Sequence, residues 1–528
     1  MSQYYRLRLP PTSGPVLAWA ALALLALAYP LAFGANMPWA DEWEFVPVLT
    51  GHEPIGPWLW RQHNEHRLPL PRLVYYAAFR AVPDFRFGSV LQVALLAAVA
   101  LGLMRRAARE RGTPAWADVF FPLVLLHGGH SENWLMGYQL CFALAAGGIG
   151  MLLIAPSRPA ILAGVALALA ACGAFGLIYA ATAAVWLTAY AVRQRRWGWL
   201  AVPLVLAMYG GFYRVGYYRP PAHPVPTDPV AVGLVAAEIL GVGLGIGVGW
   251  FWPAVATVAL LALRPGPGRW VALGGFALAL AVGVGRAGLG DAMGLWPRYS
   301  VLAWGPLAVV FLESVRRGER TLPRLLAAAA LVAFGFNAEA GLRAGAEFAR
   351  PMRAFAEALR AGESESELLQ KYAHHDDYRF HARGAIANLR DAEVGPFAKS
   401  PVRLVLGTCA VVAAMALAFV PRRRPALPPD LAPWLAEFRE AAVKTGLPRG
   451  LVWVRVDANG PARLCGRFAL VPVTIQFAPV AGSDMEDNPN ASVPRPAVAI
   501  FTFGNGRWHT DGRAVFNLPL DEVAKRFA

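Results

Sequence analysis

Long apolar runs, repeated along most of the chain, constrain its fold more than any other feature. The runs reach bilayer-spanning length, about 17–25 residues each, and short polar segments separate them. The chain has 528 residues, of which 56% are apolar and only 16% are charged, whereas a soluble chain averages about 25% charged residues. The sequence therefore predicts a mainly α, polytopic transmembrane helix bundle with about 11–13 spans across residues 1–420.

The formal net charge of +15 is concentrated in short arginine clusters at the ends of apolar runs. Such clusters are typical of the cytoplasmic loops of membrane proteins, so the charge indicates topology, and we predict no nucleic-acid partner. We interpret the first apolar run as a retained span and predict a bacterial inner-membrane protein with cytoplasmic termini. The clusters RRAARER, RQRR, RRGER and RRR cover residues 105–111, 193–196, 316–320 and 422–424.

The same topology places five longer loops on the opposite, periplasmic face. They cover residues 35–86, 127–139, 213–229, 286–298 and 338–400, the last expected to form amphipathic helices. Two of the expected spans, residues 115–127 and 321–337, each lead into one of these loops. Residues 230–263 are ambiguous, and we expect a surface or re-entrant helix over 230–246 followed by a span over 247–263.

The first of these loops is unusually rich in chemistry-bearing side chains. Residues 36–72 contain four glutamates, one aspartate, three histidines, three arginines and four tryptophans. Asp41, Glu42 and Glu44 come within a dozen residues of the first apolar run, and an acid that faces a water-filled cavity near the bilayer is usually functional. A solvated acidic loop with an aromatic interfacial belt is the alternative. Further candidates in the HNEHR stretch are His63, Glu65, His66 and Arg67.

Later loops bring more polar candidates to the same face. The stretch 127–139 carries Glu132, Asn133 and Gln139, although it also suits an ordinary polar loop. Arg286, Arg298 and Tyr299 flank the loop after the run that ends near residue 287. Because an arginine at a helix start opposes the helix dipole, Arg298 is expected to have an anionic partner, either a carboxylate or a ligand phosphate. The proline-rich 213–229 loop, with Arg214, Arg219 and His223, suits either a substrate site or an aromatic belt.

The composition changes after residue 425. A helix-like stretch and three strand-like runs with intervening turns predict a small α+β domain over residues 425–528, which we expect to be cytoplasmic and accessory. It contains neither a phosphate-binding glycine loop nor a catalytic constellation. The four cysteines of the chain show neither disulfide nor zinc-site spacing.

Five motifs together carry a resemblance: PWADEWEF, QHNEHRLPLPRL, SENWLMGYQ, GRAGLG and PRYS. An acidic pair just after the first span, on a chain of many spans, resembles the GT-C glycosyltransferase superfamily over roughly residues 15–420. That superfamily includes protein O-mannosyltransferases, the aminoarabinose transferases of lipid A and the catalytic subunits of oligosaccharyltransferase. The chain departs from several members, whose large periplasmic C-terminal domain it lacks.

The resemblance implies a polyprenyl-phosphate sugar as donor and a glycan, lipid or protein as acceptor. It assigns the general base to Asp41, with Glu42 as neighbour or alternate, and repulsion between the two carboxylates is expected to raise one pKa. Arg298 with Tyr299, then Arg286 and Arg67, are expected to stabilise the phosphate. His63, Glu65 and His66 are expected to contact the acceptor or the phosphate, and Glu132, Asn133 and Gln139 to contribute to substrate binding.

No cofactor is predicted firmly. Asp41, His63 and Glu65 are a possible ligand set for a divalent cation, because carboxylate and imidazole suit metals such as Mn²⁺. A transporter or flippase for a lipid-linked or polar substrate is the main alternative, although it predicts charged groups near the bilayer midplane rather than at one face. The second alternative is a transferase that resembles O-antigen ligases, with its site in the segment from His374 to Tyr378.

Overall fold

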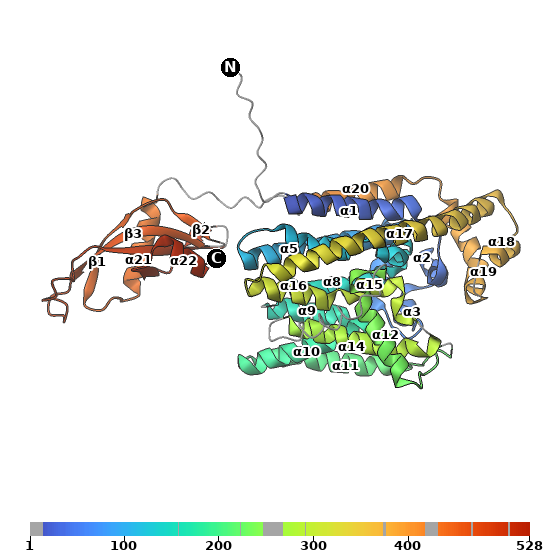
Figure 1. Cartoon of the computed structure of the whole chain (residues 1–528), viewed down its shortest axis with the longest axis horizontal. Coiled ribbons are helices and arrows are strands. Elements are labelled where there is room, and N and C mark those ends of the chain that lie inside the picture. Colours follow the sequence, from blue (N-terminus) through green and yellow to red (C-terminus); the bar gives the residue numbers. More distant parts are fainter. Residues whose placement is uncertain are drawn as a thin grey trace, which may run out of the picture. The chain divides into compact units, whose positions relative to one another are not determined.

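The chain forms two compact units, Met1–Phe419 and Val420–Ala528, of which the first is a bundle of helices and the second contains a sheet (Figure 1). The computed structural model describes residues 14–156, 158–221, 223–246, 268–290, 292–372, 376–417, 431–465, 468–504 and 507–527. The mainly α membrane fold with a small C-terminal α+β unit is therefore confirmed at this level. The expected span at 247–263 lies outside these residues, as does His374.

Six helices in the described part of the chain are long and apolar enough to cross a membrane. A seventh arises if Gly384–Phe397 and Val402–Ala416, which are bent by 60°, count as one span. This number is smaller than the expected 11–13, partly because several apolar runs form short or broken helices. The six are α1 (Gly14–Phe33), α5 (Arg86–Arg111), α8 with the turn before it (Gly137–Ile154), α10 (Ala174–Arg193), α14 with the turn after it (Arg269–Leu289) and α17 (Thr321–Ala361).

The expected span at 115–127 is wrong. The chain there forms only a six-residue helix, α6 (Phe120–Leu125), between the turns η2 (Trp116–Val119) and η3 (Gly128–His130). Six residues rise about 9 Å, far less than the bilayer core of about 30 Å. The break has a packing reason: a Cβ on Gly128 would lie 2.7 Å from the carbonyl oxygen of Asn337 in α17. The helices α7 (Ser131–Leu135) and η4 (Gly137–Gln139) then lead into α8 (Leu140–Ile154).

The helix that contains the expected span at 321–337 does not end at residue 337, because α17 covers 41 residues, Thr321–Ala361. Where the span itself ends stays a prediction. At 1.5 Å per residue it is about 60 Å long, roughly twice the bilayer core. Its second half is rich in alanine, glutamate and arginine, which favour helix whatever their polarity. Gly362, with φ of 79°, ends it. The amphipathic helices expected in 338–400 are present as α18 (Glu365–Tyr372) and α19 (Asp376–Asp391).

The remaining helices of the first unit complete the walls around the polar segments. Helix α19 packs against the first loop, so that the short helices of that loop lie at one end of the bundle (Figure 1). The remaining helices of the first unit are η1 (Ala40–Phe45), α2 (Val46–Leu49), α3 (Ile55–Trp60), α4 (Pro69–Ala81), α9 (Pro159–Ala170), η5 (Trp197–Leu200), α11 (Ala201–Arg214), α12 (Pro229–Gly241), η6 (Val242–Leu244), η8 (Ala287–Leu289), η9 (Met293–Leu295), α15 (Pro297–Ala303), α16 (Gly305–Arg316), η10 (Gly395–Phe397) and α20 (Val402–Leu417).

The second unit is an antiparallel sheet between two helices. Strands β1, β3, β4 and β5 are neighbours in that order, β2 pairs with β3 and β6 pairs with β4. Helix α21 covers one face of the sheet and α22 packs on the other. The elements are α21 (Ala432–Lys444), β1 (Leu451–Ala458), β2 (Arg463–Cys465), β3 (Phe468–Pro479), β4 (Arg495–Gly504), β5 (Arg507–His509), β6 (Ala514–Phe516) and α22 (Leu520–Phe527). Its cytoplasmic location and accessory role stay predictions.

Candidate functional site

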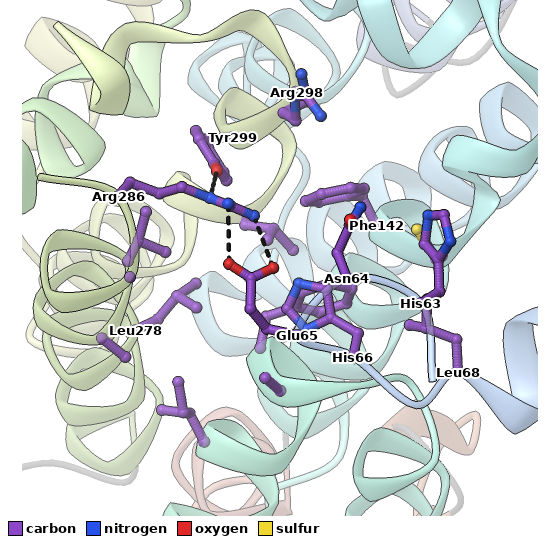
Figure 2. A pocket seen from close by; sticks show the side chains of 18 of the residues that line it. His63, Asn64, Glu65, His66, Leu68, Phe142, Leu278, Arg286, Arg298 and Tyr299 are labelled. Atoms are coloured by element: carbon purple, nitrogen blue, oxygen red, sulfur yellow. Dashed lines mark hydrogen bonds and ion pairs between the residues drawn. The ribbon is translucent and has the colours of Figure 1, made fainter. Parts of the chain in front are cut away.

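A cavity of about 300 Å³ lies within the first unit, where the first loop meets α8, α10, α14 and α15 (Figure 2). Its wall is apolar on the side of α10 and α14 and polar on the side of the first loop. The structure brings together at this cavity most of the side chains that the sequence singled out, from segments more than 200 residues apart. These are Asp41, His63, Glu65, His66, Gln139, Arg286, Arg298 and Tyr299.

The HNEH stretch forms a tight turn at the cavity wall. The main-chain N–H groups of His63 and His66 each donate to the carbonyl of the other, with both N···O distances at 2.8 Å. Asn64 has a φ of 47°, a left-handed conformation that asparagine tolerates better than most residues. In Figure 2, His63 and Glu65 lie on opposite sides of Asn64. The turn therefore divides the cavity into two differently charged ends.

At the first end, which we call the η1 end, His63 lies between two carboxylates of η1. Its Nε2 is 3.2 Å from Asp41 Oδ2 and its Nδ1 is 2.8 Å from Glu44 Oε2. Burial lowers the pKa of His63, but the hydrogen bonds and charges of the two carboxylates outweigh this effect and raise the pKa to about 9. The imidazole is therefore cationic at neutral pH.

Glu42 does not line the cavity, contrary to its expected role as an alternate base. Its side chain is buried and accepts hydrogen bonds from Tyr75 Oη at 2.5 Å and from the main-chain N–H groups of Trp39 and Tyr138. Its pKa is raised to about 7, chiefly by burial, and the charge of Asp41 is the smallest contribution. The expected raised pKa is thus present, but carboxylate repulsion is not its main cause. Glu42 joins η1 to α4 and η4.

At the second end, which we call the α14 end, Glu65 pairs with Arg286 and with His223 from the 213–229 loop. Arg286 Nη1 is 2.9 Å from Glu65 Oε1, and Arg286 Nε donates to Tyr299 Oη at 3.1 Å (Figure 2). Burial raises the pKa of Glu65, but Arg286 and the nearby histidines together lower it. His66 is buried and its pKa is lowered to about 4, mainly by burial, so it is neutral.

Arg298 has the anionic partner that its position at a helix start predicted. Its Nε lies 2.9 Å from Glu132 Oε1, its guanidinium stacks 4.3 Å from the centre of the Trp296 ring, and its carbonyl accepts from Asn133. Glu132 and Asn133 thus lie behind Arg298 rather than at the cavity. Among the described residues, no hydrogen bond of 3.5 Å or less involves the Nη groups of Arg298, whereas both Nη groups of Arg286 bond to other side chains.

Arg67 has a structural position. Its guanidinium donates to the main-chain carbonyls of Trp60, Tyr213 and Val215, which ties the first loop to the end of α11. It does not line the cavity.

Four buried polar atoms of cavity-lining side chains have no hydrogen-bond partner within the described residues. They are His66 Nδ1, Tyr138 Oη, Gln139 Oε1 and Arg298 Nε, the last of which forms only an ion pair with Glu132. Since buried polar groups are normally paired, these atoms suit a polar ligand or water. Sequence reasoning noted Glu44 among the acids of the first loop and Tyr138 in the 127–139 stretch but assigned neither a role, and it did not single out Asn64. The spacing of Glu44, three residues after Asp41, would place both side chains on one face of a helix and could have paired them.

Asp41, His63 and Glu65, the possible ligand set for a divalent cation, form ion pairs with side chains in this structure, and metal binding stays a prediction. Both ring nitrogens of His63 face carboxylates, and Glu65 is turned away toward Arg286. Within the described residues, no group of three or more histidine, cysteine, aspartate and glutamate side chains is arranged to hold a metal ion.

Comparison with known proteins gives no relative: no family model, curated protein or solved structure matches this chain.

Proposed function

We propose that the protein is a membrane glycosyltransferase that moves a sugar from a polyprenyl-phosphate donor to a hydroxyl group of a glycan, lipid or protein acceptor. One observation carries the proposal: a single cavity combines a carboxylate, an arginine with available donors, unpartnered polar atoms and an apolar wall. The resemblance to GT-C enzymes suggests the same chemistry, with the site at the periplasmic face of a bacterial inner membrane.

The apolar wall suits the lipid part of such a donor. Leu278, Val282 and Val284 of α14 line the cavity together with Phe142 and Phe175. Val284 is also 48% exposed. We propose that the apolar wall opens toward lipid at this point, so that a donor enters sideways from the bilayer.

The polar wall suits a sugar. Gln139 Oε1 accepts hydrogen bonds from sugar hydroxyls, Tyr138 Oη both donates and accepts, and His66 Nδ1 donates or accepts according to the tautomer of the ring. A site built to hydrogen-bond hydroxyl groups loses affinity for analogues that lack them, because its own polar atoms then stay unpaired. We therefore propose that these three side chains form hydrogen bonds with the hydroxyl groups of the sugar and so select it.

The proposed reaction assigns one role to each end of the substrate. Asp41 takes the proton of the acceptor hydroxyl, whose oxygen forms a bond to the anomeric carbon. The bond between this carbon and the phosphate oxygen breaks, and its electron pair leaves with the polyprenyl phosphate. Arg298 stabilises the negative charge on the leaving phosphate. We prefer Arg298 to Arg286 for this role because the Nη groups of Arg286 are occupied by Glu65 and His223.

The test uses the full-length protein in lipid vesicles with a panel of polyprenyl-phosphate sugars, each labelled in the sugar. The expected result is sugar transfer, or slow transfer to water when no acceptor is present, with release of polyprenyl phosphate. A donor that crosses the bilayer with its sugar still attached, and no released polyprenyl phosphate, would overturn the proposal in favour of a flippase. Binding of none of the panel would remove the donor class.

A further inference from the structure

Asp41 and Glu44 lie on one face of η1 because η1 is a 3₁₀ helix. Such a helix has three residues per turn, so side chains three positions apart eclipse each other. Both residues lie within Ala40–Phe45. The imidazole of His63, presented by the HNEH turn, lies between their carboxylates at 3.2 Å and 2.8 Å.

The hydrogen-bonding capacity of these groups fixes the protons between them. An ionised carboxylate only accepts hydrogen bonds, and a neutral imidazole donates through one nitrogen alone. With a carboxylate at each nitrogen, both bonds form when His63 carries a proton on both Nδ1 and Nε2. The three groups then hold two negative charges and one positive charge.

The surroundings keep the imidazole in place and separate the two carboxylates by position. The ring of His63 lies 5.6 Å from Phe45 and 5.9 Å from Tyr138, measured between ring centres. Asp41 and His63 line the cavity, whereas Glu44 does not. Glu44 therefore lies behind His63, which is itself part of the cavity lining.

The other ionisable groups near His63 belong to three elements, namely its own turn, η4 and α4. Glu65 and His66 belong to its own turn, Tyr138 belongs to η4, and the guanidinium of Arg72 in α4 lies 5.5 Å from the centre of the Phe45 ring. Within the described residues, only the carboxylates of Asp41 and Glu44 form ion pairs with His63.

We propose that Glu44 is a positioning residue, which holds His63 as an imidazolium with its Nε2–H directed at Asp41 and so keeps Asp41 an ionised base at the cavity wall. The role of Asp41 as base rests on the proposed function, but the hold of Glu44 on His63 does not. Glu44 itself touches neither substrate nor reacting atoms in this account.

The first test is spectroscopic and needs no substrate. In the full-length protein with ¹⁵N-labelled histidine, the His63 ring, assigned with His63→Gln, is expected to show two protonated nitrogens at neutral pH. Loss of the Glu44 charge in Glu44→Gln is expected to lower the pH of half-protonation by about one unit or more. Glu53→Gln is the matched control, because Glu53 lies in the same segment but pairs with Arg61 at the surface. Equal titration of His63 in the wild type and Glu44→Gln would overturn the proposal.

The second test is kinetic. Glu44→Gln is expected to lower kcat about 10-fold or more, as loss of a carboxylate that orients a histidine does elsewhere, with the donor KM within about twofold. Glu44→Asp keeps the charge and is expected to recover most of kcat, which a lost packing contact would not do. Full kcat in Glu44→Gln contradicts the positioning role. A wild type without transferase activity removes the proposed function alone, since the His63 spectra still decide whether Glu44 holds the imidazolium.

Discussion

The two ends of the cavity begin in the same four-residue turn but carry opposite charge balances. At the η1 end, two carboxylates, Asp41 and Glu44, share the single imidazole of His63. At the α14 end, the single carboxylate of Glu65 is shared by Arg286 and a histidine of the neighbouring loop. The η1 end therefore has an excess of negative charge, which suits a base. The α14 end has no such excess. In the proposed reaction, the turn would therefore separate the place of proton transfer from the part of the cavity that holds the rest of the substrate.

The largest expected effect comes from the η1 end. Asp41→Asn removes the base and keeps the shape of the side chain, so transfer is expected to fall about 10²–10⁴-fold. Donor binding is expected to stay within about threefold, because Asp41 is proposed to act on the acceptor. A reconstituted transfer assay and equilibrium donor binding measure the two quantities. Glu65→Gln is the comparison at the α14 end, and an equal loss of transfer there would break the contrast.

The second prediction concerns Glu42, whose buried carboxyl joins η1 to α4 and η4 through hydrogen bonds. Its pKa is about 7 in the folded protein against an ordinary value of 4.5. Between these values the folded state binds a proton that the unfolded state has released, so the free energy of unfolding falls as pH rises through this window. The full effect is roughly 3 kcal/mol. Because Glu42→Gln cannot titrate, the stability of the wild type relative to this variant is expected to decrease between about pH 5 and pH 8.

Thermal unfolding of the solubilised protein across this pH range measures that difference. Glu53→Gln, at an exposed carboxylate of the same segment, is the control and is expected to follow the wild type at every pH. If the curves of wild type and Glu42→Gln run parallel from acidic to alkaline pH, the carboxyl of Glu42 does not titrate in this window and the assignment is wrong.

The third prediction separates the two arginines of the cavity. Arg298→Lys keeps the charge next to Glu132 but loses the planar fork that binds phosphate, so the donor KM is expected to rise about 10-fold with little change in stability. Arg286→Lys loses one or more charged hydrogen bonds and is expected to cost about 1.5 kcal/mol of stability with the donor KM within twofold. Steady-state kinetics and thermal unfolding of both variants decide the matter. A reversed outcome would assign the phosphate to the α14 end.

Length and apolarity predicted α1, α5, α8, α10 and α14, because these signals are local in the sequence. One error came where distant packing decides the structure. The run at 115–127 breaks because Gly128 packs against Asn337 and Gly341, more than 200 residues later. Helix α17 passes the expected boundary because a change in polarity marks the edge of a membrane, not the end of a helix.

The residues of the site were easier to predict than their partners. Asp41, His63 and Glu65 stood out because so many chemical groups crowd one loop. That Glu65 pairs with Arg286 depends on a contact across 221 residues, which no local pattern contains. Glu42, adjacent to Asp41 in the sequence, lies in the core because η1 turns neighbouring side chains to different sides.

The smallest expected effect concerns the turn that joins the two ends. Asn64 has a left-handed backbone, which costs most residues with a Cβ roughly 1–2 kcal/mol. Asn64→Ala is therefore expected to lower stability by about 1 kcal/mol, whereas Asn64→Gly, which accepts this conformation freely, changes it by less than about 0.5 kcal/mol. Thermal unfolding measures both. Asn64→Gly also removes a side chain that lines the cavity. If this variant keeps its stability and its transfer rate, Asn64 serves only to shape the turn. If stability is kept and transfer falls, the carboxamide contacts the substrate, and the region between the two ends is itself part of the binding site.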